Sequence, residues 1–210
     1  MTALDELFPA PGAGVALPGM AVGVVTSNAD PEQLARVKVR FPALSETVES
    51  AWAPVVTPMA GADRGLQLLP EVGDTVLVAF EQGDVNRPFV LGGFWSAAQH
   101  PPQGDDPGNA VRLVRSRSGH LIRLDDTEGA ERVEIVDKSG KNSITIDSVA
   151  NKITVTSSGD LEVTAQGALT LGGRSVAITA QQQLTATGRQ SAELSSQGGL
   201  TVRGATVDIN

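Results

Sequence analysis

The sequence predicts an all-β protein in two parts, a small barrel or sandwich followed by a trimeric prism of short strands. Two observations lead to this prediction. All seven aromatic residues lie at or before Trp95 and all twelve prolines at or before Pro107, so the two parts differ sharply in composition. An apolar-x-apolar pattern then recurs nine times between Ile144 and Ile209, with glycine in most of the intervals. A regular repeat of short apolar pairs is typical of a β-solenoid.

The composition of the 210 residues excludes several classes of protein. There is no cysteine, which excludes disulfides and thiolate metal sites, and there are only two histidines, His100 and His120. No run reaches the ~18–20 apolar residues of a membrane span, and the acidic N-terminal residues lack the order of a secretion signal. We therefore expect a soluble chain without a cleaved leader and without a metal or cofactor. The net charge of −8 disfavours nucleic acid as a partner.

The predicted barrel occupies residues 21–96. Its strands are indicated by apolar or alternating runs at residues 21–26, 36–41, 75–80 and 89–94. Strands about ten residues apart, separated by clusters of Gly, Pro and Asp, are typical of a small barrel or sandwich. The bulky candidates for its core or for an interface are Trp52, Phe80, Phe89 and Trp95.

Two further segments flank the barrel. Residues 1–20 are an N-terminal arm, in which residues 4–8 could form one amphipathic helical turn. Residues 97–110 are rich in proline and turn-forming residues, and they are the predicted linker to residues 111–210.

The repeat unit is a very short strand followed by a turn. The middle residue of each apolar pair is mostly threonine or acidic, as expected for a side chain that points to water. Successive pairs begin seven to nine residues apart, and six of the eight intervals contain glycine, which suits a sharp corner. The residues expected to form the apolar interior are Ile144, Ile146, Ile153, Val155, Leu161, Val163, Leu169, Leu171, Val176, Ile178, Leu184, Leu194, Leu200 and Val202.

A strand unit this short cannot enclose its own interior. A single-chain β-helix needs a coil of several strands, and a step of about eight residues supplies only about a third of one. Three chains, each giving one strand per level, would close a triangular prism around the apolar pairs. The sequence therefore predicts a homotrimer with an intertwined, triple-stranded β-helix over residues 111–210 and a tip at residues 200–210.

Residues 23–95 resemble the OB-fold domain of contractile-tail spikes, a family that includes phage baseplate assembly protein V, phage tail spikes and the VgrG proteins of type VI secretion. The segments that carry the resemblance are RVKVRFP at 36–42, PEVGD at 70–74, VLVAF at 76–80, RP at 87–88 and VLG at 90–92. The segments SGH at 118–120 and LDDT at 124–127 resemble the start of the β-helix in these proteins. The resemblance implies an OB-fold barrel followed by the trimeric β-helix.

The resemblance also implies partners. VgrG proteins carry a long hub-like region before the OB domain, whereas only residues 1–20 precede it here, so the hub is expected to be a separate protein at the end of the tail tube. The linker leaves no room for the lysozyme domain of some phage spikes, and no histidine follows His120 to build the iron-binding tip of others. The C-terminal residues instead resemble tips capped by a PAAR-repeat protein, with Val207, Ile209 and Asn210 as the expected contacts.

Three local patterns have both a functional and a structural interpretation. Arg36, Lys38 and Arg40 lie on one strand face and could contact nucleic acid, but in an acidic domain they are expected to be solvated or to contact an acidic neighbouring subunit. The acidic run at residues 125–129 lacks the alternating spacing of a calcium loop and is expected to be a turn. No nucleophile motif accompanies His120, so a structural role is expected for it.

These observations predict the central spike of a contractile injection machine: a phage tail, a tailocin or an extracellular injection system. The spike is expected to assemble in the cytoplasm into a baseplate, to dock on the hub and to be driven into a target cell envelope on contraction. It is not expected to be an enzyme, and no catalytic residue is assigned. Two alternatives stay open: a β-helical polysaccharide-degrading enzyme and a receptor-binding fibre.

Overall fold

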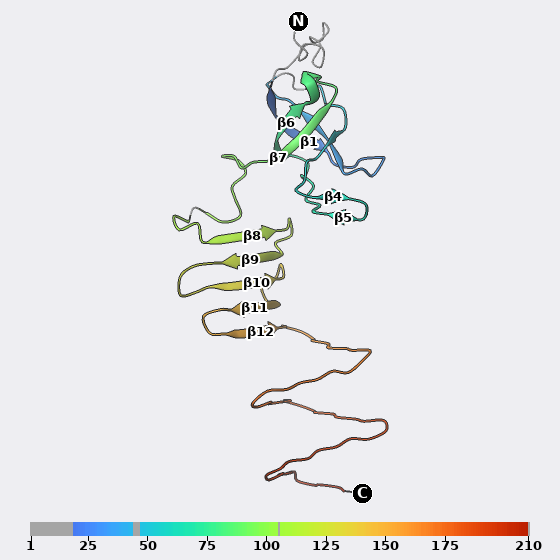
Figure 1. Ribbon diagram of the computed structural model, residues 1–210, viewed down its shortest axis with the longest axis vertical. Helices are drawn as coiled ribbons and strands as arrows, with labels where there is room; N and C mark the ends of the chain where they lie inside the picture. Colours follow the sequence, from blue (N-terminus) through green and yellow to red (C-terminus); the bar gives the residue numbers. More distant parts are fainter. Residues whose placement is uncertain (1–18, 44–46, 105, 210) are drawn as a thin grey trace, which may run out of the picture. The chain divides into compact units, whose positions relative to one another are not determined.

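Residues 20–93 form a five-stranded antiparallel sheet that curls into a nearly closed barrel (Figure 1). The computed structural model describes residues 19–43, 47–104 and 106–209. The barrel sheet has the order β3-β2-β1-β6-β7, and the Val56 N–H donates to the Val90 carbonyl at 2.8 Å, which links the residues after β3 to β7. Its strands are β1 (Met20–Ser27), β2 (Arg36–Arg40), β3 (Ala53–Pro54), β6 (Thr75–Phe80) and β7 (Pro88–Gly93).

Two small elements interrupt the barrel sequence. A two-stranded ribbon, β4 (Ala60–Gly61) and β5 (Arg64–Gly65), lies between β3 and β6 in the chain. A single 3-10 turn, η1 (Glu81–Gly83), connects β6 to β7. The four strands expected at residues 21–26, 36–41, 75–80 and 89–94 are confirmed to within one residue at their starts and ends.

The barrel core consists almost entirely of valine. Alternate residues of each strand point inward, and β-branched side chains pack well on such a pleated surface. Of the bulky candidates, Phe80 belongs to the core, whereas Trp95 is 65% exposed and does not. The buried core residues are Val25, Val37, Val39, Ala53, Val76, Val78, Phe80 and Val90.

Gly23 on β1 allows β2 to approach closely, which gives a testable prediction. A Cβ atom at Gly23 would lie 2.2 Å from Cγ1 of the buried Val39. We expect Gly23→Ala to lower the free energy of unfolding by about 1–3 kcal/mol, because overpacking displaces core side chains. Chemical denaturation measures this loss. Gly93→Ala is the control, since its nearest atom would be the Thr75 carbonyl oxygen at 3.6 Å, and an equal loss in both variants would contradict the packing argument.

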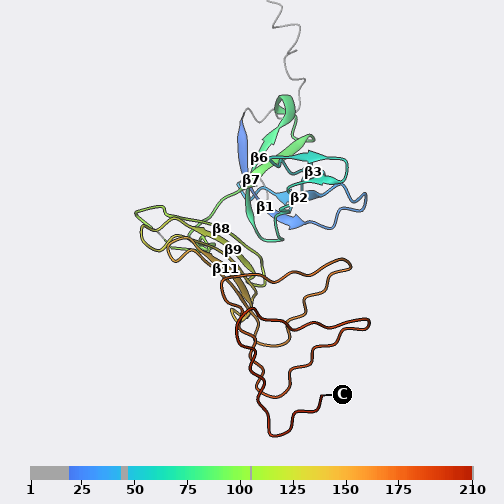
Figure 2. The ribbon, with the colours of Figure 1, turned by 60° about the horizontal axis from the view of Figure 1, so that its bottom comes forward.

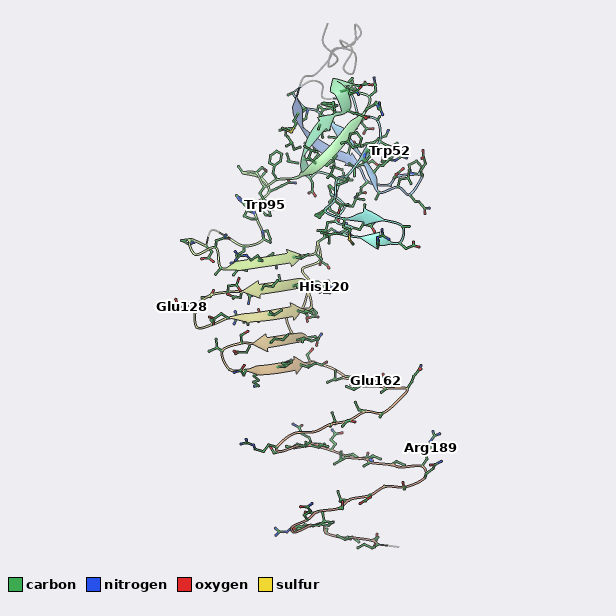
Figure 3. All side chains as sticks on the ribbon, viewed as in Figure 1. Trp52, Trp95, His120, Glu128, Glu162 and Arg189 are labelled. Carbon is green, nitrogen blue, oxygen red and sulfur yellow. The ribbon has the colours of Figure 1, made fainter. Side chains whose placement is uncertain are left out.

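Residues 111–156 form a second five-stranded antiparallel sheet, in which each strand pairs with the next one along the chain. Each strand has five residues, so the sheet is a regular meander. His120 and Glu128 lie at opposite ends of it, each in a connecting loop (Figure 3). The strands are β8 (Val111–Arg115), β9 (Leu121–Asp125), β10 (Arg132–Val136), β11 (Ser143–Asp147) and β12 (Lys152–Thr156).

Residues 159–210 are a separate unit of the chain, and residues 1–158 are the other. Within residues 159–209 no strand pairs with another strand of the same chain, and both views show an open, winding trace (Figures 1 and 2). The backbone bends at regular intervals that separate the apolar pairs of the sequence repeat. These bends lie at residues 158–159, 166–167, 173–174, 181–182, 189–190, 197–198 and 205.

The bends agree with the corners that the repeat predicts, and Arg189 marks one of them in Figure 3. The trimeric β-helix itself is not seen in a single chain, so it stays a prediction. The helical turn expected at residues 4–8 and the expected contact residue Asn210 lie outside the described residues.

Candidate assembly interface

The second sheet has one largely apolar face and one face on which charged side chains lie among Val111, Leu113, Leu121 and Val136. The strand register places alternate residues of all five strands on the same side. Arg112, at the β8 edge, lies on the apolar side. We call the apolar face the set Val114, Ile122, Leu124, Val133, Ile135, Ile144, Ile146, Ile153 and Val155. We call the charged face the charged side chains of the other side, the set Arg115, Arg123, Asp125, Arg132, Glu134, Asp147 and Lys152.

The burial of the two faces is the reverse of that in an ordinary soluble sheet. Every residue of the apolar face is between 37% and 70% exposed. On the charged face, the side chains of Asp125 and Glu134 are only 9% and 15% exposed. Nine large apolar side chains on one sheet face form a contiguous exposed surface, and such surfaces mark interaction sites. The apolar face is therefore the candidate assembly interface.

Only part of this interface follows from the sequence repeat. Ile144, Ile146, Ile153 and Val155 were expected in an apolar interior, and the structure brings them together on one face. Their five partners were missed because they lie upstream of the regular repeat. A signal was present: the pairs Ile122/Leu124 and Val133/Ile135 have the same apolar-x-apolar form, but longer loops separate them. The five partners are Val114, Ile122, Leu124, Val133 and Ile135.

The expected interior residues of the second unit are also exposed in a single chain. From Leu161 to Val202 their exposed fractions lie between 54% and 75%. At the expected tip, Val207 is 48% exposed and Ile209 is 90% exposed. These residues thus have the accessibility that an interface requires, and their assignment to a trimer core and a tip contact stays a prediction.

Ion pairs occupy the charged face. Arg123 Nε donates to Glu134 Oε2 at 2.8 Å, and Arg132 Nη2 lies 3.5 Å from Asp125 Oδ2. The Thr127 hydroxyl donates to Asp125 Oδ1 at 2.6 Å, and this hydrogen bond, together with the nearby arginines, lowers the pKa of Asp125. The carboxylates of this face are therefore committed to contacts within the chain.

The acidic run that begins at Asp125 and the histidine His120 both have structural roles in this sheet. Asp125 accepts from both the hydroxyl and the N–H of Thr127, which closes the turn after β9. His120 Nδ1 accepts from the Lys138 N–H at 3.2 Å and so joins two loops at one end of the sheet. Both observations agree with the structural interpretation of the sequence.

The basic strand β2 is partly neutralised by neighbouring carboxylates. Arg36 binds Asp30 through two hydrogen bonds of 2.8 Å, from Nε to Oδ2 and from Nη2 to Oδ1. Lys38 Nζ lies 3.4 Å from Glu49 Oε2. Arg36 and Lys38 are therefore engaged with acidic residues of their own chain.

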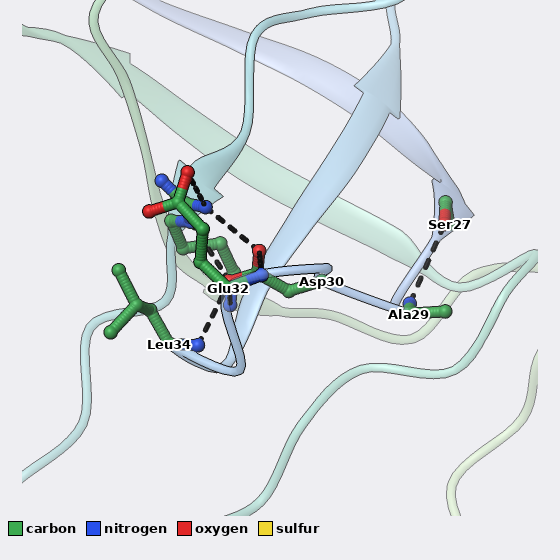
Figure 4. A network of polar contacts seen from close by, with 6 residues as sticks. Ser27, Ala29, Asp30, Glu32 and Leu34 are labelled. Atoms are coloured by element: carbon green, nitrogen blue, oxygen red, sulfur yellow. Dashed lines mark hydrogen bonds and ion pairs between the residues drawn. The ribbon is translucent and has the colours of Figure 1, made fainter.

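Asp30 organises the loop between β1 and β2 (Figure 4). Its side chain is 2% exposed and also accepts hydrogen bonds from the backbone N–H groups of Glu32 and Leu34. The Arg36 guanidinium is the main cause that holds the pKa of this carboxyl well below its usual range, and the backbone donors lower it further. The network fixes the conformation of this loop against the start of β2.

The lowered carboxyl pKa values predict a loss of stability in acid. The Ser139 hydroxyl and Asn142 lower the pKa of Asp137 to about 2, and the pKa of Asp30 is lowered in the same direction. A carboxyl with a depressed folded-state pKa stabilises the fold fully above its unfolded value of about 3.9, and this stabilisation is lost as the pH falls through the folded value. We expect the denaturation midpoint to fall between about pH 4 and pH 2.

Denaturant titrations at a series of pH values measure this effect. Asp137→Asn and Asp30→Asn should each flatten the pH dependence, because each removes one group that gains a proton on unfolding. Ser118→Asn, in an exposed loop, is the control and should keep the full dependence. A midpoint that does not change across this pH range in the unmodified protein would contradict the prediction.

The barrel carries a cavity of about 600 Å³ beside this loop. It is lined by residues 33–35, by Pro54 and Val55, and by most of the ribbon segment 57–69, and its titratable lining residues are Asp63 and Arg64. In the described part of the chain, no cluster of three or more histidine and acidic side chains is placed to hold a metal ion. Among the same residues, no helix has the length and apolar character that a membrane crossing requires.

Comparison with known proteins connects this geometry to a family. Residues 21–95 match the injector OB domain of type VI secretion systems and phage baseplates. The chain is 33% identical over 117 residues to the type VI secretion system spike protein VgrG1a of Pseudomonas aeruginosa. The aligned residues cover 50% of this chain and 18% of VgrG1a. Residues 21–95 are thus similar to the OB domain of the VgrG-like contractile-tail spike family.

Two other spike proteins of this family extend the similarity. VgrG2a of Pseudomonas aeruginosa is 26% identical over 152 residues, or 66% of this chain and 18% of VgrG2a. VgrG3 of Vibrio cholerae is 28% identical over 111 residues, or 49% of this chain and 11% of VgrG3. The chain thus spans less than a fifth of the length of these relatives. The barrel of this VgrG-like chain lies within the matched OB domain, and its nearly closed five-stranded sheet is consistent with an OB fold.

Proposed function

We propose that three copies of this chain form the central spike of a contractile injection machine. The observation that carries the proposal is the apolar face of the second sheet, which is exposed while the opposite face is charged and more shielded. Three such sheets with their apolar faces turned inward would bury all nine residues of each copy. Full burial of a large aliphatic side chain gains ~1.5–3 kcal/mol, so such an assembly is strongly favoured over a single exposed sheet.

The second unit supports the same arrangement along the shaft. Residues 159–209 place an apolar pair between successive bends, and no strand ladder forms within one chain. Backbone N–H and C=O groups of an extended segment need partners, and neighbouring copies would supply them as an intertwined, triple-stranded β-helix. The domain plan proposed for the chain is an arm (1–20), an OB-fold barrel (21–96), a linker (97–110) and the trimeric spike (111–210).

The proposed mechanism is mechanical. The barrel would dock on a separate hub protein at the end of the tail tube, the tip would carry a PAAR-repeat protein, and contraction would drive the shaft into a target cell envelope. Interchain backbone hydrogen bonds and an apolar interior would resist buckling. The similarity to VgrG spike proteins and the absence of net charge over residues 151–210 support this role. Assembly would take place in the cytoplasm, in the baseplate of a phage or phage-like particle.

Gene deletion with complementation tests this function. Without the chain, the source cells should produce no complete contractile particles, because the baseplate lacks its centre. The unmodified gene and a Thr154→Asp variant, whose change lies off the apolar face, should restore them. A gene carrying Ile135→Asp with Ile144→Asp should not. Fully assembled, active particles in the deletion strain would contradict the proposal.

The two alternatives are an enzyme that degrades polysaccharide and a receptor-binding fibre. The cavity beside β3 offers a single carboxylate and a single guanidinium, Asp63 and Arg64, which is a poor basis for glycoside cleavage by paired carboxylates. Incubation with capsular polysaccharide or peptidoglycan tests the first alternative, and measurable turnover would favour it. Binding of the isolated chain to intact target cells would favour the second.

A further inference from the structure

The apolar pattern of the second sheet does not by itself fix how its strands pair. Side chains alternate with a period of two, so a slip of one residue would turn the apolar residues to the wrong face. A slip of two residues keeps every side chain on its proper face, so the alternation alone does not exclude it. Another feature must therefore specify the register against two-residue slips.

The connecting loops leave such slips open. Residues 116–120, 126–131 and 137–142 connect the first four strands, and none of these loops is a tight two-residue turn. A loop of six residues can give up two of them to the strands and still close the connection. A two-residue slip would displace the strand by about 6.6–6.8 Å, which would shift its apolar pair out of line with the rest of the face.

On the charged face, positive and negative side chains alternate both across the strands and along them. Along one row across the sheet, Asp125, Arg132, Asp147 and Lys152 stand opposite one another on successive strands, with alternating charge. In the next row, Arg123 stands opposite Glu134. The sign also alternates along β9 and along β10, and Arg132 Nε lies 3.5 Å from Glu134 Oε2. Each of these charges therefore has neighbours of the opposite sign.

Two-residue slips would turn these attractions into repulsions. Moving β10 along β9 in one direction would bring Asp125 opposite Glu134, and moving it in the other would bring Arg123 opposite Arg132. Like charges directly opposite each other destabilise an antiparallel pair. The pairings of β8 with β9 and of β10 with β11 are each protected in the same way against one of their two slips. That slip would bring Arg115 opposite Arg123 in the first pairing and Glu134 opposite Asp147 in the second.

We propose that the alternating charges of the charged face lock the register of β8–β12, and that Arg132 is the central residue of this lock. Arg132 faces Asp125 on one side and Asp147 on the other, and it lies beside Glu134. Its side chain is 39% exposed and those of the two carboxylates nearest to it are 9% and 15% exposed, so solvent screens these charges incompletely. The lock acts within one chain and stands whether or not three copies assemble.

Disulfide trapping reads the register directly, because the chain has no cysteine of its own. Ile122→Cys with Ile135→Cys places two thiols opposite each other in the observed register. Ile122→Cys with Val133→Cys would place them opposite each other only after a two-residue slip. Both pairs are introduced into the full-length chain, alone and together with Arg132→Glu, which would attract Arg123 in the slipped register. Peptide mapping after mild oxidation gives the yield of each intrachain disulfide.

The expected result is that the unmodified charges trap the 122–135 pair and leave the 122–133 pair reduced. With Arg132→Glu, the ratio of native to slipped disulfide should fall roughly tenfold, because three attractive contacts become repulsive. An unchanged ratio would overturn the proposal. A rescue variant combines Arg132→Glu with Arg123→Glu and Glu134→Arg. It also carries Asp125→Asn and Asp147→Asn, whose side-chain oxygens can still accept the hydrogen bonds from Thr127 and Ala150. If Arg132→Glu unfolds the sheet, the rescue variant should restore the native disulfide, and failure to restore it would equally contradict the lock.

Discussion

Two aspartates on the apolar face, Ile135→Asp with Ile144→Asp, should break the assembly into single chains. These two residues face each other across β10 and β11 and are 50% and 44% exposed in one chain. In the proposed trimer they would be buried, and an unpaired buried carboxylate costs several kcal/mol. Six carboxylates in one interior would exceed what the remaining apolar contacts contribute. Light scattering should show the mass fall from about 65 kDa, three times 21.7 kDa, to that of one chain, or show aggregates.

Thr154→Asp is the matched control for this prediction. Thr154 lies on the opposite side of the sheet and faces Thr145, so the new charge should meet neither the apolar face nor another carboxylate directly. The control should keep the mass of the unmodified protein. If the Ile135/Ile144 variant also kept that mass, the apolar face would not be the assembly interface.

Two aspartates at the C-terminal tip, Val207→Asp with Ile209→Asp, should abolish binding of a PAAR-repeat protein and leave the trimer intact. Both residues belong to the last apolar pair of the repeat, and Ile209 is 90% exposed in one chain. Binding a cap would bury these positions, and a loss of about 2.7 kcal/mol corresponds to a hundredfold weaker complex. We expect at least this effect, since three copies carry the change. Calorimetric titration with a PAAR-repeat protein provides the measurement.

Thr206→Asp is the control. It adds one charge next to the same apolar pair, but at a residue that alternates with Val207 and Ile209 and so is expected to point to the other side of the strand. It should bind the cap about as well as the unmodified protein does. Cap binding that survives Val207→Asp with Ile209→Asp would show that the tip contact lies elsewhere. A trimer that falls apart in this variant would instead assign these residues to the shaft.

The sequence predicted the barrel well because its strands carry strong local patterns. The alternation of Arg36, Val37, Lys38 and Val39 sets the buried face of β2, and the valines it contains do form the core. Trp95 shows the limit of this reasoning. It was a candidate for the core or for an interface, and the core alternative is wrong because the barrel interior is already filled by valines and Phe80.

The pairing within the second sheet could not be predicted from the repeat. An apolar-x-apolar pair gives the position of a strand and the side that it buries, but it does not say which strand lies beside it. The structure shows that β8–β12 pair within one chain, so in this region a single chain supplies a whole sheet. The apolar residues of β8, β9 and β10 were not predicted as part of the interior, because loops of five and six residues interrupt the regular spacing of the apolar pairs.

The mass of the unmodified chain in solution tests the central claim most directly. The account predicts a folded, β-rich particle of about 65 kDa that keeps this mass over a dilution series, because a single chain exposes its apolar face. A well-folded particle of 21.7 kDa with the same β content would contradict it.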